Sequence, residues 1–81
     1  MVDSPSVGAS TSRRSRYQGY EIESRAAYDG HYWYAMFLVR GPADVYWMRH
    51  LCQTRHETED AAHSVALQTA RLAIKVKLDR F

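Results

Sequence analysis

The sequence contains one cysteine, Cys52, so no disulfide can form within the chain. Small secreted domains usually depend on several disulfides, and a single thiol therefore favours a reducing, intracellular setting. The sequence has no run of about 18 apolar residues, which argues against a membrane-spanning helix. Its first residues are polar and small, so we expect no secretory signal and predict a cytoplasmic location.

Net charge is also scarce, and its placement along the chain is informative. The formal net charge is +2, and this excess falls within residues 1–16, where Arg13, Arg14 and Arg16 outnumber one aspartate. Residues 17–81 carry equal numbers of basic and acidic side chains. Domains that hold nucleic acid through its phosphates normally have a basic body, so this distribution counts against such a function.

The first sixteen residues contain little that a core could bury. They are rich in serine and other small polar residues, a composition typical of disordered chain ends. We therefore expect a disordered N-terminal tail over residues 1–16 and a single domain over residues 17–81. Within the tail, Arg13, Arg14 and Arg16 are a candidate basic contact for an acidic partner, although a solubilising role is more common for such segments.

Three segments of the domain are typical of β-strands. Residues 17–25 alternate between apolar and polar side chains, as a half-buried strand does. An Asp29-Gly30 turn signal then precedes residues 31–40, an aromatic-rich segment with one formal charge. A loop containing Pro42 separates this segment from a third strand over residues 45–53, whose two faces are both mixed in polarity.

The middle segment is apolar on both faces of the strand that it would form. We assign one face to the side covered by a helix, because Ala35 leaves room for close packing; its members are Trp33, Ala35, Phe37 and Val39. The other face is the candidate interaction surface, formed by Tyr32, Tyr34, Met36 and Leu38. Long side chains of the neighbouring strands are an alternative cover for this second face.

The last segment favours one long helix that ends at about Leu78. Apolar residues recur there at helical spacing, and neither glycine nor proline interrupts them. Two starts are open: Thr54, with Glu57 at capping-box spacing, or Thr58, which directly precedes two acidic residues. The expected core stripe consists of Ala62, Val65, Ala66, Thr69, Leu72, Ala73 and Val76, and is broadened by Leu67, Ile74 and Leu78.

Short connections between successive strands favour antiparallel pairing. The sequence therefore predicts an α+β fold, a three-stranded antiparallel sheet with one C-terminal helix packed on one face, in the order β-β-β-α.

Several short motifs lie on these predicted elements: Tyr17-Gln18-Gly19-Tyr20-Glu21-Ile22, Asp29-Gly30, Trp33 with Ala35, and Thr58 to Ala61. In these motifs the chain resembles small uncharacterised proteobacterial β-β-β-α proteins, over residues 17 to about 75. The resemblance implies a fold and a bacterial cytoplasmic setting but no activity, because the motifs are structural. His31 and Tyr32 depart from the pattern, which usually has basic or polar residues before the tryptophan.

The groups that could carry chemistry form no recognisable site. One set has metal-ligating side chains but no standard zinc spacing: His50, Cys52, His56 and His63. Cys52 lacks a spare loop that could build a pocket around it, and Glu21 and Glu23 lie on one strand without a cleft. We therefore expect no metal, no cofactor and no enzymatic activity.

These observations predict a non-catalytic protein-interaction module that acts through its aromatic sheet face, on a protein partner or on a second copy. The alternative is a nucleic-acid-binding or regulatory module that combines the sheet aromatics with the arginines of the tail. No membrane contact is expected.

Overall fold

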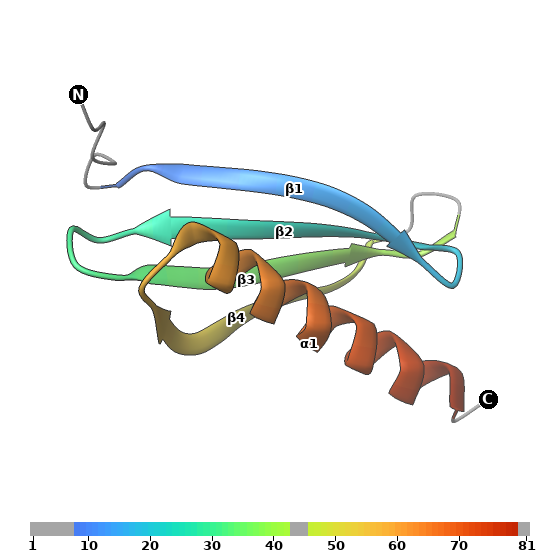
Figure 1. Ribbon diagram of the computed structural model, residues 1–81. Helices are drawn as coiled ribbons and strands as arrows, with labels where there is room; N and C mark the ends of the chain where they lie inside the picture. The colour runs from blue at the N-terminus through green and yellow to red at the C-terminus, as the bar shows by residue number, and fades with distance from the viewer. Residues whose placement is uncertain (1–7, 43–45, 80–81) are drawn as a thin grey trace.

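The chain forms a four-stranded antiparallel sheet followed by one helix (Figure 1). The computed structural model describes residues 8–42 and 46–79. The elements are β1 (Ser10–Tyr17), β2 (Tyr20–Tyr28), β3 (Trp33–Arg40), β4 (Tyr46–His56) and α1 (Glu59–Asp79). Strands that are consecutive in the sequence are neighbours in the sheet. The predicted α+β class, with an antiparallel sheet and one C-terminal helix, is confirmed.

The sheet has one strand more than the sequence predicts. Ser10–Tyr17 forms the edge strand β1 and pairs with β2 along its whole length, from Ser10 opposite Ala27 to Tyr17 opposite Tyr20. The predicted disordered tail is therefore wrong for residues 10–16, while residues 1–7 lie outside the described residues. β1 contains no aliphatic side chain, so it shows none of the apolar alternation from which a strand is usually predicted.

A tight turn joins β1 to β2. Gln18 and Gly19 both have positive φ, 53° and 84°, as a two-residue type I′ hairpin turn requires. Glycine adopts this backbone conformation without steric cost, and its twist matches that of the two flanking strands. The turn thus brings the arginine-rich edge strand onto the predicted domain.

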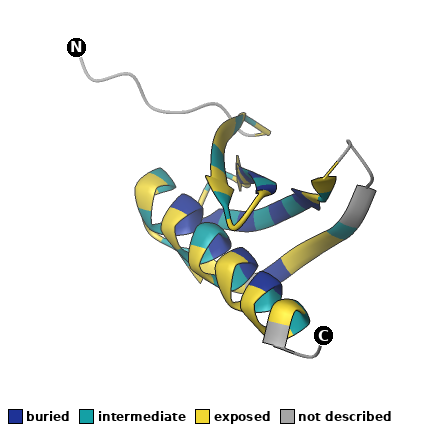
Figure 2. Cartoon of the chain, turned by 90° about the vertical axis from the view of Figure 1, so that its right-hand side faces the viewer, coloured by how far each residue is buried: buried dark blue, intermediate teal, exposed yellow. Residues whose placement is uncertain are grey.

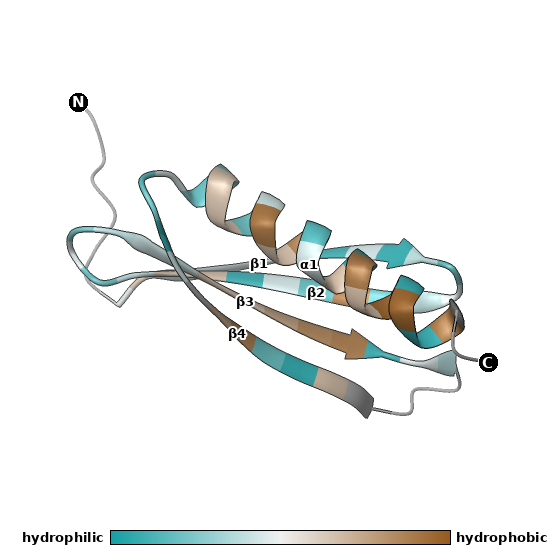
Figure 3. Cartoon of the chain, turned by 90° about the horizontal axis from the view of Figure 1, so that it is seen from below, coloured by the Kyte–Doolittle hydropathy of each residue, from teal (hydrophilic) through white to brown (hydrophobic). Residues whose placement is uncertain are grey.

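The core lies between one face of the sheet and α1, which packs mainly on β2 and β3 (Figure 2). Its largest fully buried side chains are Ile22, Phe37, Val39 and Ile74. Trp33, Ala35, Phe37 and Val39 are all buried against the helix, so the predicted choice of face on the middle strand is confirmed. β3 is also the most apolar strand in Figure 3.

The predicted helix stripe is correct only in part. The side chains buried against the sheet are Ala62, His63, Ala66, Ala70 and Ile74. Leu72 and Val76, both expected in the core, are 61% and 46% exposed. The alanines allow the helix to approach the sheet closely, while Leu72 and Val76 lie away from the core.

Thr58 caps the helix, and Thr54 lies within β4. The Thr58 hydroxyl accepts a hydrogen bond from the Ala61 N–H at 3.1 Å, and Glu59 and Asp60 lie in the positive first turn.

We expect Thr58→Ala to lower the free energy of unfolding by about 1 kcal/mol in urea denaturation. Thr54→Ala, the matched control, should change it by less than about 0.5 kcal/mol. Equal losses in the two variants would contradict this assignment of the cap.

Candidate functional site

The face of the sheet opposite α1 is the candidate site, and we call it the open face. The register across the four strands places Arg14 opposite Glu23, Glu23 opposite Leu38, and Leu38 opposite Arg49. Because side chains alternate between faces, every second residue on each strand shares this side. The charged and large apolar members are Arg14, Arg16, Glu21, Glu23, Arg25, Tyr34, Met36, Leu38, Arg40, Arg49, Leu51 and Arg55.

The open face carries a strong positive charge. Its described residues include six arginines and two glutamates, which gives a formal charge of +4. Of the other acidic side chains, Glu59 and Asp60 lie at the start of α1, and Asp29 lies in the β2–β3 loop beside one end of the open face. The inference that the folded body lacks a basic surface is therefore wrong, since β1 belongs to that body and the fold separates charges by face.

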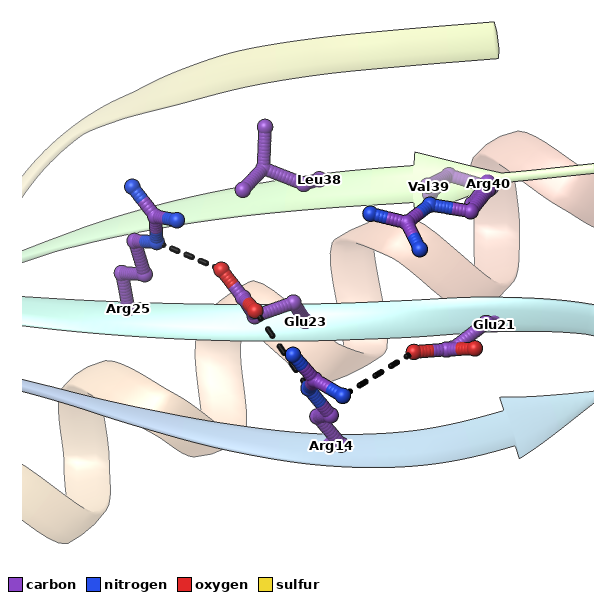
Figure 4. A pocket seen from close by; sticks show the side chains of 7 residues that line it. All are labelled: Arg14, Glu21, Glu23, Arg25, Leu38, Val39 and Arg40. Atoms are coloured by element: carbon purple, nitrogen blue, oxygen red, sulfur yellow. Dashed lines mark hydrogen bonds and ion pairs between the residues drawn. The ribbon is translucent and has the colours of Figure 1, made fainter. Parts of the chain in front are cut away.

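Two glutamates organise part of this arginine cluster (Figure 4). Glu23 lies between Arg14, at 3.5 Å, and Arg25, at 2.6 Å. Arg14 also approaches Glu21 at 3.9 Å, and Arg40 lines the same hollow of about 220 Å³. The ion pairs are exposed, so they contribute little to stability. These ion pairs instead hold the guanidinium groups of Arg14 on β1 and Arg25 on β2 over the plane of the sheet.

The predicted interaction residues lie where the sequence places them. Tyr34, Met36 and Leu38 are half-buried on the open face, and Tyr32 is exposed directly before β3. Arg55 lies over the Tyr32 ring, with its guanidinium carbon 5.1 Å from the ring centroid. The open face therefore combines an apolar and aromatic strip on β3 with arginines on both sides of it.

The three arginines predicted as a basic tail do not act together. Arg14 and Arg16 point to the open face, whereas Arg13 points to the helix side and binds the Asp60 carboxylate at 2.5 Å and Glu59 at 3.4 Å. The hydrogen bond with Asp60 raises the pKa of Arg13 and lowers the pKa of Asp60. Arg13 thus ties β1 to α1 instead of contributing to the candidate site.

His63 is a structural residue that the sequence analysis missed. Its ring is buried, with Nδ1 at 2.7 Å from the Ser24 hydroxyl and Nε2 at 2.8 Å from the Thr11 hydroxyl. Burial, followed by the nearby Arg13, lowers the pKa of His63. The ring links α1 to both β1 and β2, and thereby helps to hold the strand that carries Arg14 and Arg16.

Cys52 and the metal-ligating side chain types are the remaining groups that could carry chemistry. Within residues 8–42 and 46–79, no cluster of three or more His, Cys, Asp or Glu side chains could hold a metal ion. Cys52 is buried, and burial raises the pKa of its thiol, which keeps it protonated and poorly nucleophilic. Among the residues that the structure describes, no helix combines the length and the apolar character needed to cross a membrane.

Comparisons with known proteins give no relative from which a function could be transferred. No family model, curated protein or solved structure matches this chain.

Proposed function

We propose that the protein binds single-stranded nucleic acid on its open face, without catalysis. The observation that carries this proposal is the separation of charge by the fold, which gives that face six arginines and two glutamates. Polyanions are attracted to such a surface through their phosphates, and guanidinium groups match phosphate oxygens with paired hydrogen bonds. Nucleic-acid binding is the alternative function that the sequence leaves open, and the two arginines that β1 adds to the open face, Arg14 and Arg16, support it.

The arrangement of side chains suits a single strand better than a duplex. Unpaired bases stack on aromatic and planar groups, which the open face offers at Tyr32, Tyr34 and Arg55. Met36 and Leu38 extend this strip along β3, while Arg25 on β2 and Arg49 on β4 lie on the strands to either side. A strand that follows β3 would place bases on the strip and phosphates toward the arginines.

The positive charge of the open face also weakens the prediction of self-association. Two copies that met through their open faces would bring two surfaces of charge +4 together, and their repulsion opposes contact. A protein partner would have to be acidic, which makes an acidic polypeptide the competing ligand to test.

The test is fluorescence anisotropy with a mixed-sequence single-stranded oligonucleotide, repeated over a range of salt concentrations. We expect binding at low salt that weakens steeply as salt rises, with a log–log slope of about −0.7 for each phosphate neutralised. Arg49→Glu should weaken binding by tenfold or more, because it reverses one charge within the open face. A matching duplex should bind more weakly, since its bases are not available for stacking.

Lys75→Glu is the matched control, because it makes the same change in net charge on the exposed side of α1. It should reduce binding much less than Arg49→Glu does. Equal effects of the two variants would indicate attraction to net charge alone. No binding at low salt, together with binding of polyglutamate, would overturn the proposal in favour of an acidic protein partner.

A further inference from the structure

One end of the open face contains a hollow of about 450 Å³, lined by Tyr34, Leu51, Cys52 and Arg55. It lies where the pairing of β3 with β4 is irregular. Ala35 is opposite Cys52, but the next residue, Tyr34, is opposite Arg55, so β4 has two extra residues at this point. Such a bulge bends the strand and redirects side chains, and here it opens space beside Tyr34.

The polar groups around the hollow are held in place. The Asp29 carboxylate accepts hydrogen bonds from the N–H groups of His31 and Tyr32, at 2.8 and 2.7 Å. The Asp29 carboxylate also interacts with the Tyr34 hydroxyl and raises the pKa of that tyrosine. Arg55 is oriented by the Tyr32 ring beneath it. The loop, the two tyrosines and the arginine therefore form one connected group.

The side chains that line this hollow differ in their capacity to form hydrogen bonds. Arg55 supplies N–H donors, and Leu51 and the buried Cys52 add a largely apolar wall. The Tyr34 hydroxyl interacts with the Asp29 carboxylate. A ligand that fits should have a flat apolar body and an edge with two neighbouring acceptors. Guanine has this edge, with O6 and N7 side by side, whereas adenine presents a donor next to N7.

We propose that this hollow binds one unpaired guanine of a bound single strand, with Arg55 on the O6 and N7 atoms and the base against Tyr34 and Leu51. The proposal rests on the function proposed above and names the base that the open face prefers at this position. The two rings of guanine also cover Tyr34 and Leu51 more fully than a pyrimidine would.

The experiment uses the full chain and oligothymidines of about 12 nucleotides in which one central residue is dG, dA or dC. We expect the dG strand to bind about tenfold more tightly than the dA strand, and also more tightly than the dC strand. Oligouridines with one G or one A form a second arm, and the same order of affinity there shows that both RNA and DNA supply the ligand. An order that holds in only one arm identifies that nucleic acid as the source of the guanine.

Arg55→Lys keeps the positive charge but removes the planar pair of donors, so it should abolish most of the preference for guanine while retaining binding. Arg49→Lys is the matched control, from the same strand and face but outside the hollow, and it should leave the preference unchanged. Far-ultraviolet circular dichroism checks that both variants are folded. If all strands bind but guanine has no advantage, or if Arg55→Lys retains it, the guanine site is wrong and the general function stands. If no strand binds, both proposals fail.

Discussion

Replacing Phe37 by alanine is expected to lower the free energy of unfolding by about 3–5 kcal/mol. Phe37 is 1% exposed and lies under α1, among the largest fully buried side chains of the protein. Its removal would leave a cavity that the surrounding alanines are too small to fill. A domain of this size has a total stability of about 5–15 kcal/mol, so the variant should unfold at a much lower urea concentration.

Leu38→Ala is the control for this prediction, because Leu38 follows Phe37 directly and points to the open face. Its side chain is only partly buried, so we expect a loss of about 1 kcal/mol. Urea denaturation followed by circular dichroism measures both variants. A larger loss for Leu38→Ala than for Phe37→Ala would mean that the helix covers the other face of the sheet.

The order of β2, β3, β4 and α1 could be predicted from the sequence because each has a strong local signal. On β3, both faces are apolar, and the small side chain of Ala35 was enough to identify the face that α1 covers. Thr58 and the two acidic residues after it also marked the helix start as one of two possibilities. These features depend on residues close together in the chain.

β1 could not be predicted in this way, because its folded conformation depends on residues that are distant in the sequence. Its serine, threonine and arginine side chains bury little, and the strand is held by the backbone of β2 and by contacts with α1. Arg13 bonds to Asp60, 47 residues away, and Thr11 bonds to His63, 52 residues away. A polar segment of this kind has the composition of a disordered tail until its partners are known.

The positive charge of the open face could not be predicted from the sequence, for a related reason. Counting charges along the chain shows a neutral domain, but a strand sends neighbouring side chains to opposite faces. Arg13 and Arg14 are adjacent in the sequence, and yet one pairs with the helix and the other lies on the open face. Only the register of all four strands shows that six arginines share one surface.

The second large effect concerns His63. We expect His63→Ala to lower the free energy of unfolding by about 2–4 kcal/mol, because it removes both hydrogen bonds of the ring and leaves the buried Ser24 hydroxyl without that partner. His63→Gln keeps a hydrogen-bond donor and an acceptor and should therefore lose less. Since β1 carries Arg14 and Arg16, His63→Ala should also weaken nucleic-acid binding under conditions in which the variant is still folded.

The same residue makes stability depend on pH in a defined direction. Burial lowers the pKa of His63 in the folded state, so the unfolded chain takes up the proton at higher pH than the folded one does. The contribution of His63 is complete above about pH 6.5, the usual pKa of histidine, and is lost as pH falls below that value through the folded pKa. Arg13 from β1 adds to this effect, whereas Glu59 and Asp60 from α1 oppose it.

Urea denaturation at about pH 7.5 and pH 5 separates this effect from the other ionisable groups, since both values lie above the usual carboxylate range. The lowered pKa values of Asp29 and Asp60 affect stability only under more acidic conditions, and the remaining histidines are the same in every variant. Between these two pH values the unmodified protein should lose more stability than His63→Gln, because glutamine does not titrate. An equal loss of stability in both proteins would show that the hydrogen bonds of His63 to Ser24 and Thr11 do not depend on a neutral imidazole.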